Sequence, residues 1–216
     1  MEGFDDLFGE TYLHFWGEAL SGERSDREAG VIRSLLDLEQ GTEVLDLACG
    51  HGRIANRLAA GGARVTGLDR SAVFLERARA EAAELGVEVE YVEGDMRAIP
   101  WRGRFDAVLC WFTAFGYFDD DVLHEVLGGV RSALRPGGCF LLERRRYDPL
   151  RGGMDTEYVA LRDGRVERYP VFIRSPTYTE LRDWLLAAGF SRVEGFGEDG
   201  EPLAAEHRRT LWLAHA

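Results

Sequence analysis

The stretch VLDLACGHGRIANRLAAGGARVTGLDRS, residues 44–71, decides the fold of this chain. It begins with a short apolar run that contains one acid, Asp46, as is typical of a buried parallel strand. Gly50 and Gly52 follow, and after them comes a helical pattern of apolar residues. A second apolar run ends on Asp69. This order of strand, glycine turn, helix, strand and acid predicts two parallel strands with a binding site at their carboxyl ends.

Strands and helices alternate on both sides of this stretch. Helices are expected over residues 28–38, 72–85 and 122–134, and strands over residues 87–92, 105–111 and 139–144. The polar segment 21–26 is expected to be a turn that precedes the first helix. Strands that alternate with helices specify a parallel sheet covered by helices on both faces.

The pattern changes after residue 144. Two segments, 155–161 and 165–171, flank Asp163–Gly164, a dipeptide that favours a hairpin turn. A capping box at Thr177-x-x-Glu180 opens a further helix, and two strands over 191–196 and 207–213 complete the pattern. The hairpin is expected either to cover a substrate or to contact a second copy of the chain.

Composition limits the partners of this chain. Of its 216 residues, 45% are hydrophobic and 30% are charged, as in ordinary globular domains. The formal net charge of −12 repels phosphate backbones, so a nucleic-acid partner is not expected. The N-terminus lacks a signal-peptide pattern and no apolar run approaches about 18 residues, so a cytoplasmic protein without membrane contact is expected. Three cysteines without paired spacing predict neither a disulfide framework nor a metal site.

The glycine turn suits two kinds of adenosine-bearing ligand. Gly50-x-Gly52, with Asp69 nineteen residues after Gly50, matches a dinucleotide fingerprint but also occurs in methyltransferases. Asp46 favours a cationic ligand that carries an ammonium and a sulfonium over a dinucleotide. A carboxylate near the turn attracts those positive groups and repels a pyrophosphate. Gly94–Asp95–Met96, after the third strand, offers an acceptor to an adenine amine and an apolar side chain to its ring.

Five motifs together resemble the class I S-adenosylmethionine-dependent methyltransferases, in particular the members that act on small molecules. They are VLDLACGHGR (44–53), VTGLDRS (65–71), EGDM (93–96), FDAVLCW (105–111) and LRPGG (134–138). The resemblance covers about residues 28–196. It implies an α/β three-layer sandwich with a seven-stranded, mostly parallel sheet, whose last strand is antiparallel. It also implies S-adenosylmethionine as methyl donor, S-adenosylhomocysteine as product and a small-molecule acceptor.

The same resemblance suggests how one domain, 1–216, is divided. An N-terminal helical lid (1–27) would precede a core that binds S-adenosylmethionine (28–150). A small β-hairpin insertion (151–175) and a C-terminal helix and strand pair (176–216) would follow the core. We expect a monomer or a homodimer.

The resemblance also implies roles for residues near the glycine turn. Asp46 would orient the methionine ammonium of the donor. Ala48, Cys49 and Gly50 would contact its methionine part through their backbone, with Gly52 in the same turn.

Residues at the next three strand ends would hold the adenosine part. Asp69 would bind both ribose hydroxyls, and Asp95 would bind the adenine amine. Met96 and Arg70 would flank the adenine ring, and Trp111 would end the fourth strand against the ligand.

Three further residues could contact the carboxylate of the donor. They are His51, for which a solvent-facing role is the alternative, Arg53, for which a surface salt bridge is the alternative, and Arg24.

No residue is compelled to be catalytic, because the donor is already activated and positioning can supply much of the rate. Tyr12 and His14 are the preferred candidates for a general base, ahead of Tyr117, His124 and His207. Two other functions stay open: an NAD(P)-dependent oxidoreductase on a Rossmann-like fold, and a non-catalytic sensor or partner protein that binds S-adenosylmethionine.

Overall fold

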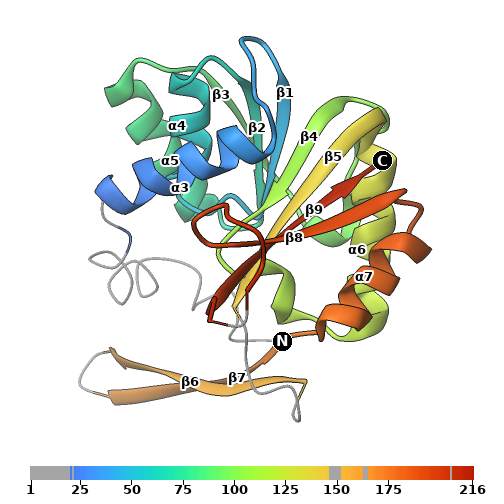
Figure 1. The fold of residues 1–216 in the computed structure, drawn as a ribbon. Helices are drawn as coiled ribbons and strands as arrows, with labels where there is room; N and C mark the ends of the chain where they lie inside the picture. The colour runs from blue at the N-terminus through green and yellow to red at the C-terminus, as the bar shows by residue number, and fades with distance from the viewer. Residues whose placement is uncertain (1–19, 21, 146–151, 163–164, 205) are drawn as a thin grey trace.

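A computed structural model describes residues 20, 22–145, 152–162, 165–204 and 206–216. Seven strands of this part form one sheet in the order β3-β2-β1-β4-β5-β9-β8 (Figure 1). Their bounds are β1 Glu43–Leu47, β2 Arg64–Asp69, β3 Val89–Glu93, β4 Phe105–Cys110, β5 Leu134–Arg145, β8 Arg192–Gly197 and β9 Arg209–His215. The strands β1 to β5 pair in parallel, whereas β9 is antiparallel to both β5 and β8. The prediction of a mostly parallel sheet with an antiparallel last strand is confirmed.

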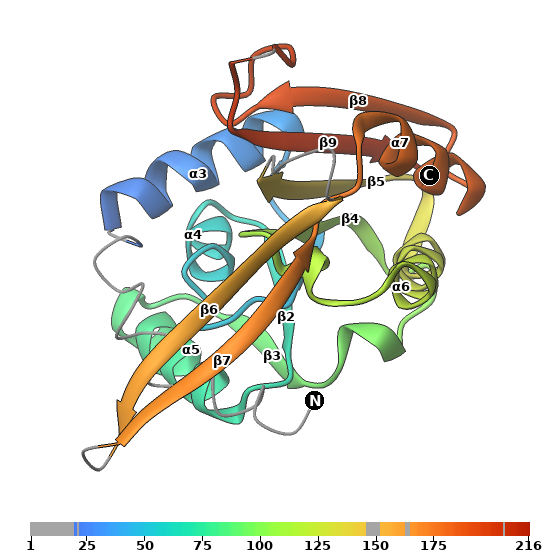
Figure 2. The same cartoon turned by 90° about the horizontal axis from the view of Figure 1, so that it is seen from below.

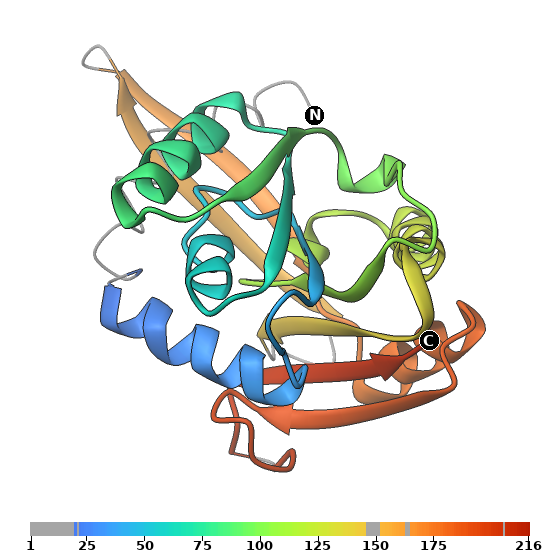
Figure 3. The same ribbon diagram turned by 90° about the horizontal axis from the view of Figure 1, so that it is seen from above.

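Helices cover both faces of the sheet and make three layers (Figures 2 and 3). One face carries α3 (Gly22–Leu35), α4 (Ala55–Ala60) and α5 (Ala72–Leu85), and the other carries α6 (Asp120–Ala133) and α7 (Tyr178–Ala187). Each central strand packs against the helices of both faces, because its successive side chains point to opposite faces of the sheet. In β1, Val44 packs with the first group of helices and Leu45 packs with the second.

Two helices begin where their capping residues predict. The Ser71 hydroxyl accepts a hydrogen bond from the Phe74 amide at 3.3 Å and opens α5, which ends at Gly86 with a φ of 67°. Thr177 and Glu180 form a complete capping box at the start of α7. These local signals need no long-range contact, and the sequence therefore places these helices well.

The helix α3 starts earlier than predicted and ends at Leu35 instead of Leu38. It begins at Gly22, so the turn expected over 21–26 is wrong for residues 22–26. Two polar residues of this segment, Ser25 and Asp26, bond to side chains from the region of α4. Ser25 is buried against Arg53, and the Asp26 carboxylate accepts a hydrogen bond from Arg57 at 2.6 Å. These polar side chains attach α3 to α4 and to the turn before it, a contact that the sequence pattern does not show.

The predicted hairpin forms a separate two-stranded sheet of β6 (Gly153–Arg162) and β7 (Arg165–Arg174). Each strand extends a few residues beyond its predicted bounds. The ribbon runs across the edge at which the parallel strands end (Figures 1 and 2). The predicted lid falls mostly on residues 1–19, which lie outside the described part of the chain.

Candidate active site

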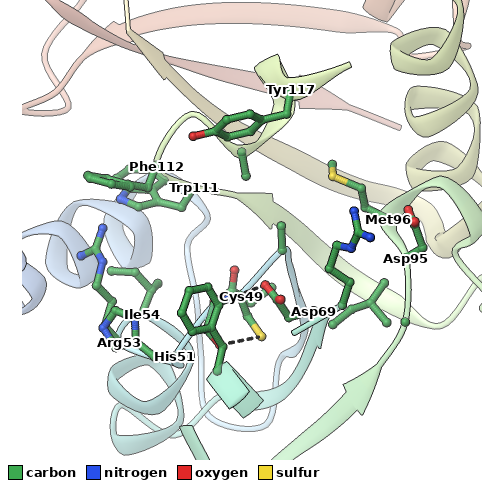
Figure 4. A pocket seen from close by; sticks show the side chains of 18 of the residues that line it. Cys49, His51, Arg53, Ile54, Asp69, Asp95, Met96, Trp111, Phe112 and Tyr117 are labelled. Atoms are coloured by element: carbon green, nitrogen blue, oxygen red, sulfur yellow. Dashed lines mark hydrogen bonds between the residues drawn. The ribbon is translucent and has the colours of Figure 1, made fainter. Parts of the chain in front are cut away.

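A pocket opens at the carboxyl ends of β1, β2, β3 and β4 (Figure 4). All predicted donor-binding residues except Gly52 line it, namely Asp46, Ala48, Cys49, Gly50, Asp69, Arg70, Asp95, Met96 and Trp111. The other lining residues are Leu20, His51, Arg53, Ile54, Leu68, Phe74, Gly94, Phe112, Ala114, Tyr117 and Phe118. The residues meet here because parallel strands present their carboxyl ends at one edge of a sheet.

Asp69 holds the glycine turn in shape. One of its carboxylate oxygens accepts a hydrogen bond from the Gly50 amide at 2.8 Å, and the other accepts one from the Ser71 amide at 2.9 Å. Gly50 itself has a φ of 56°, in the left-handed region that favours glycine. Burial raises the pKa of Asp69. The carboxylate is thus fixed in the pocket wall before any ligand binds.

Gly52 has a packing role instead of a place in the pocket lining. A Cβ atom at this position would lie 2.3 Å from the Tyr91 hydroxyl oxygen and 2.7 Å from the Ala78 Cβ. The Tyr91 hydroxyl donates to Asn56 at 2.6 Å, so it has little freedom to move. The second glycine of the turn is therefore needed for close contact between the turn, α5 and β3.

Asp46 is a buried acid in the pocket wall, with an exposed fraction of 2%. Burial raises its pKa to about 7, a shift that Arg53 opposes and Asp69 increases. A buried carboxylate is costly in its charged form unless a cation compensates it. The pocket therefore suits a ligand that brings a positive charge to the glycine turn.

Arg53 is buried beside Asp46 and is no surface salt bridge. Its Nη1 lies 2.7 Å from Glu28 Oε2 and donates to the Ser25 hydroxyl at 3.3 Å. Its Nη2 is buried and has no hydrogen-bond partner among the described residues. A buried donor of this kind is costly to leave unpaired, so it suits an anionic group of a ligand.

His51 and Arg24, the other two candidates, lie in different places. His51 lines the pocket, and burial together with Arg53 lowers its pKa to about 4, so its ring is neutral at pH 7. Arg24 is not part of the pocket lining. Its Nε donates to Glu28 at 3.0 Å, and its guanidinium stacks on the Phe112 ring, as that of Arg53 also does.

Asp95 and Met96 stand at the end of β3, on the side of the pocket opposite Arg53 (Figure 4). The Asp95 carboxylate accepts hydrogen bonds from the backbone and the guanidinium of Arg97, which lower its pKa. It is therefore charged at neutral pH. Met96 is buried and offers an apolar surface next to it.

A buried ionic network behind the pocket was missed by the sequence analysis. Arg209 of β9 donates to Glu28 at 2.6 Å and to Glu143 of β5 at 2.7 Å. Glu28 also accepts a hydrogen bond from the Trp111 indole at 2.9 Å. Glu143 accepts one from the Thr113 amide at 2.7 Å. One signal was present: Glu143, with an exposed fraction of 0%, follows an apolar run much as Asp46 stands within one.

This network sets the shape of the loop after β4. Phe112 and Thr113 both have positive φ values, 62° and 63°, which cost free energy for residues other than glycine. The Glu143 carboxylate offsets this cost by accepting a hydrogen bond from the Thr113 amide. Glu28 holds the Trp111 ring in place by accepting a hydrogen bond from its indole N–H. The aromatic wall of the pocket is thus held by acids on two distant elements.

The candidate general bases separate clearly. Tyr12 and His14 lie outside the described residues. His124 packs against Trp184 at 4.7 Å between ring centroids, and His207 lies 3.6 Å from Asp199, so neither lines the pocket. Tyr117 lines the pocket. Within the described ranges, no group of three or more His, Cys, Asp or Glu could hold a metal ion, and no helix is long and apolar enough to cross a membrane.

Comparisons with known proteins agree with this geometry. A family model described as a methyltransferase domain matches residues 44–138. The chain is 30% identical over 168 residues to a ubiquinone biosynthesis O-methyltransferase from Xanthomonas axonopodis pv. citri, a match that covers 75% of this chain and 68% of the relative. It is 36% identical over 108 residues to an uncharacterized methyltransferase from Synechocystis sp., about half of each chain.

Solved structures share the fold at low sequence identity. An S-adenosylmethionine-dependent methyltransferase from Clostridium acetobutylicum superposes with a TM-score of 0.76 at 16% identity, covering 95% of this chain and 98% of that one. A glycopeptide N-methyltransferase in complex with S-adenosylmethionine gives a TM-score of 0.66 at 22% identity, covering 88% and 93% of the two chains.

Proposed function

The chain belongs to the class I S-adenosylmethionine-dependent methyltransferases, and on that basis we propose that it methylates a small-molecule acceptor by in-line displacement. S-adenosylmethionine is its methyl donor. One observation carries the assignment of the donor site: Asp46, Asp69 and Asp95, from the ends of three strands, line a single pocket. The ammonium, the ribose and the adenine amine of the donor each need an acceptor, and the three acids offer one from each of three neighbouring strands.

The residues near the glycine turn fit the amino-acid end of the donor. Asp46 would receive the ammonium, which compensates the buried carboxylate. The free Nη2 of Arg53 would receive the carboxylate. Ala48, Cys49 and Gly50 would contact this end through their backbone.

The residues at the ends of β2, β3 and β4 fit the adenosine part. Asp69 would accept hydrogen bonds from the ribose hydroxyls, and Asp95 from the adenine amine. Met96 and Arg70 would flank the ring, and Trp111 would close the site at the end of β4.

A dinucleotide fits this pocket less well. Its pyrophosphate would lie at the glycine turn beside Asp46, a buried acid whose ionisation an anionic ligand opposes, so that no charge pairing is gained. The same carboxylate attracts the sulfonium and ammonium of S-adenosylmethionine. An oxidoreductase with a nicotinamide cofactor is therefore not favoured.

The bound donor supplies a methyl group that a sulfonium has already activated. The protein then has to orient the acceptor and exclude water from the site. Trp111 and Phe112 serve both purposes, because they form an apolar wall at the end of β4 that Glu28 and Glu143 hold in place.

Two observations support a small acceptor. The relatives include an O-methyltransferase of ubiquinone biosynthesis, and the structural neighbours include an N-methyltransferase of glycopeptides. The net charge of −12 disfavours a nucleic acid. Oxygen and nitrogen are accordingly the acceptor atoms to test.

Asp69→Asn tests the donor site. The variant keeps the shape of the side chain but removes its negative charge and replaces one of the two oxygens that accept hydrogen bonds from the Gly50 and Ser71 amides. We expect calorimetry to show roughly 10- to 100-fold weaker binding of S-adenosylhomocysteine, since hydrogen bonds to a charged acceptor contribute about 1.5–3 kcal/mol. Asp183→Asn, on the exposed surface of α7, is the matched control and should bind like the wild type. Equal affinity in both variants would refute the ribose-binding role of Asp69.

A further inference from the structure

Tyr117 stands where the donor pocket meets the hairpin. It ends η3 (Ala114–Tyr117), the short helix that follows β4, and it lines the pocket. Its ring lies across the cavity from Cys49 and Asp69 (Figure 4). On its other side it packs against Val171 and Ile173, which are buried residues of β7. The same side chain therefore faces the donor site and the hairpin.

The base of the hairpin is fixed to the body of the protein. Arg174 donates to Asp120 of α6 at 2.7 Å and to Glu180 of α7 at 3.0 Å. Gly116 lets the ribbon approach η3, because a Cβ atom there would lie 2.7 Å from both the Arg174 carbonyl oxygen and the Ile173 Cγ2. The position of Tyr117 is thus set by β7 as well as by its own helix.

A second tyrosine from the hairpin meets the Tyr117 hydroxyl. The Tyr158 hydroxyl oxygen lies 3.4 Å from that of Tyr117, and either can be the donor. Tyr158 shares the inner face of the ribbon with Met154, and both pack against the cluster of Val171 and Ile173. Tyr158 is only partly buried, so a proton that reaches it can pass to water.

The segment that carries Tyr117 also gives the pocket apolar side chains. Phe112, Ala114 and Phe118 line the pocket together with Tyr117. The guanidinium groups that approach Phe112 are already paired with Glu28. A molecule that binds here gains most from a ring, and its polar group meets a phenol.

We propose that Tyr117 contacts the nucleophilic atom of the methyl acceptor, that Tyr158 orients the Tyr117 hydroxyl, and that the acceptor is a ring-bearing molecule with a hydroxyl or an amino group. This inference rests on the proposed function and extends it to the acceptor side. Tyr117 is the catalytic residue in this scheme, and Tyr158 is a positioning residue.

The transfer step balances through the two phenols. A lone pair of the acceptor atom forms the bond to the methyl carbon, while the bond between that carbon and sulfur breaks and its electron pair stays on sulfur. The acceptor proton passes to the Tyr117 oxygen as the Tyr117 proton passes to Tyr158. Tyr158 releases its own proton to water, so both phenols end neutral.

Tyr117→Phe and Tyr158→Phe test this arrangement, with Tyr178→Phe as matched control. Tyr178 opens α7 and packs against Trp212, away from the pocket. Each variant is titrated with S-adenosylhomocysteine by calorimetry. Release of S-adenosylhomocysteine from S-adenosylmethionine is then measured with a panel of monocyclic phenols, catechols and ring-bearing amines at millimolar concentration.

We expect the affinity for S-adenosylhomocysteine to stay within about twofold in all three variants. Turnover of the best phenol should fall about 10²-fold in Tyr117→Phe, as for loss of a proton-transfer group, and about tenfold in Tyr158→Phe. In Tyr117→Phe, turnover should also rise about tenfold per pH unit at pH values below the pKa of the acceptor phenol, because the acceptor must then ionise without help from a protein group. The wild type and Tyr178→Phe should depend less steeply on pH.

The outcomes separate this inference from the proposed function. A folded wild type that does not bind S-adenosylhomocysteine overturns the proposed function. Normal binding with wild-type turnover and pH dependence in Tyr117→Phe overturns the role of Tyr117 alone. Normal binding without methylation of any member of the panel overturns the acceptor class.

Discussion

Asp46 is the residue whose ionisation should leave the clearest trace in solution. Its pKa is raised by burial from 3.8 to about 7. Between these pH values the folded protein holds a proton that the unfolded chain has released. The free energy of unfolding therefore falls as the pH rises through this range, by at most about 1.4 kcal/mol per pH unit from this group.

Asp46→Asn should remove that contribution. We expect urea unfolding of the ligand-free proteins to show a smaller loss of stability between about pH 5 and pH 7 in the variant than in the wild type. Saturation with S-adenosylhomocysteine should weaken the effect in the wild type, because its ammonium favours the charged carboxylate. The same pH dependence in both ligand-free proteins would contradict a protonated Asp46.

Single residues were predictable from the sequence when their signal was local. Asp46 and Asp69 stand out because each is an acid at the end of, or within, an apolar run, and both line the pocket. Gly52 looks like a ligand-binding glycine in the sequence. The structure places it against Tyr91, which is distant in sequence, so no local pattern could reveal its packing role.

Among the elements, α3 carries a buried acid, Glu28, that pairs with side chains of other parts of the chain. Burial alone would raise the pKa of Glu28, but the guanidinium groups of Arg53 and Arg209 and the hydrogen bond from Trp111 lower it to about 2. Glu28→Gln would leave both guanidinium groups buried without their full counter-charge. We expect a loss of about 3–5 kcal/mol in the free energy of unfolding.

Urea unfolding measures this loss, with Glu23→Gln as the matched control. Glu23 lies on the same helix, but its pair with Arg27 is exposed, so its replacement should change the stability by less than about 0.5 kcal/mol. The stability that Glu28 contributes should be present above its ordinary pKa of 4.5 and disappear as the pH falls toward about 2. Equal effects of the two substitutions would show that the network does not hold α3.

The sequence predicted elements well where caps and periodicity are local, and less well where contacts are distant. The helix α5 begins and ends at its predicted residues because Ser71 and Gly86 act within one turn. The start of α3 could not be predicted in this way, since Ser25 and Glu28 owe their burial to residues of other elements. For the same reason, Glu143 was not expected to be a buried counter-charge.

The whole molecule combines a predictable donor half with a less predictable acceptor half. The donor pocket follows from the order of strands, and a family model covers residues 44–138. On the acceptor side, Tyr117 meets Tyr158 across 41 positions, and behind the pocket Glu28 meets Arg209 across 181. Such contacts depend on where the hairpin and the last strands dock, and one sequence does not specify this.

The central claim, that the pocket at the ends of β1 to β4 binds S-adenosylmethionine, has one direct test. The wild-type protein is titrated in a calorimeter with S-adenosylhomocysteine and, in parallel, with NAD⁺ and NADP⁺. We expect S-adenosylhomocysteine to bind with a dissociation constant on the order of micromolar, a free energy of about −8 kcal/mol, and the two dinucleotides not to bind. Folded protein that binds a dinucleotide, or that gives no heat with millimolar S-adenosylhomocysteine, would contradict the claim.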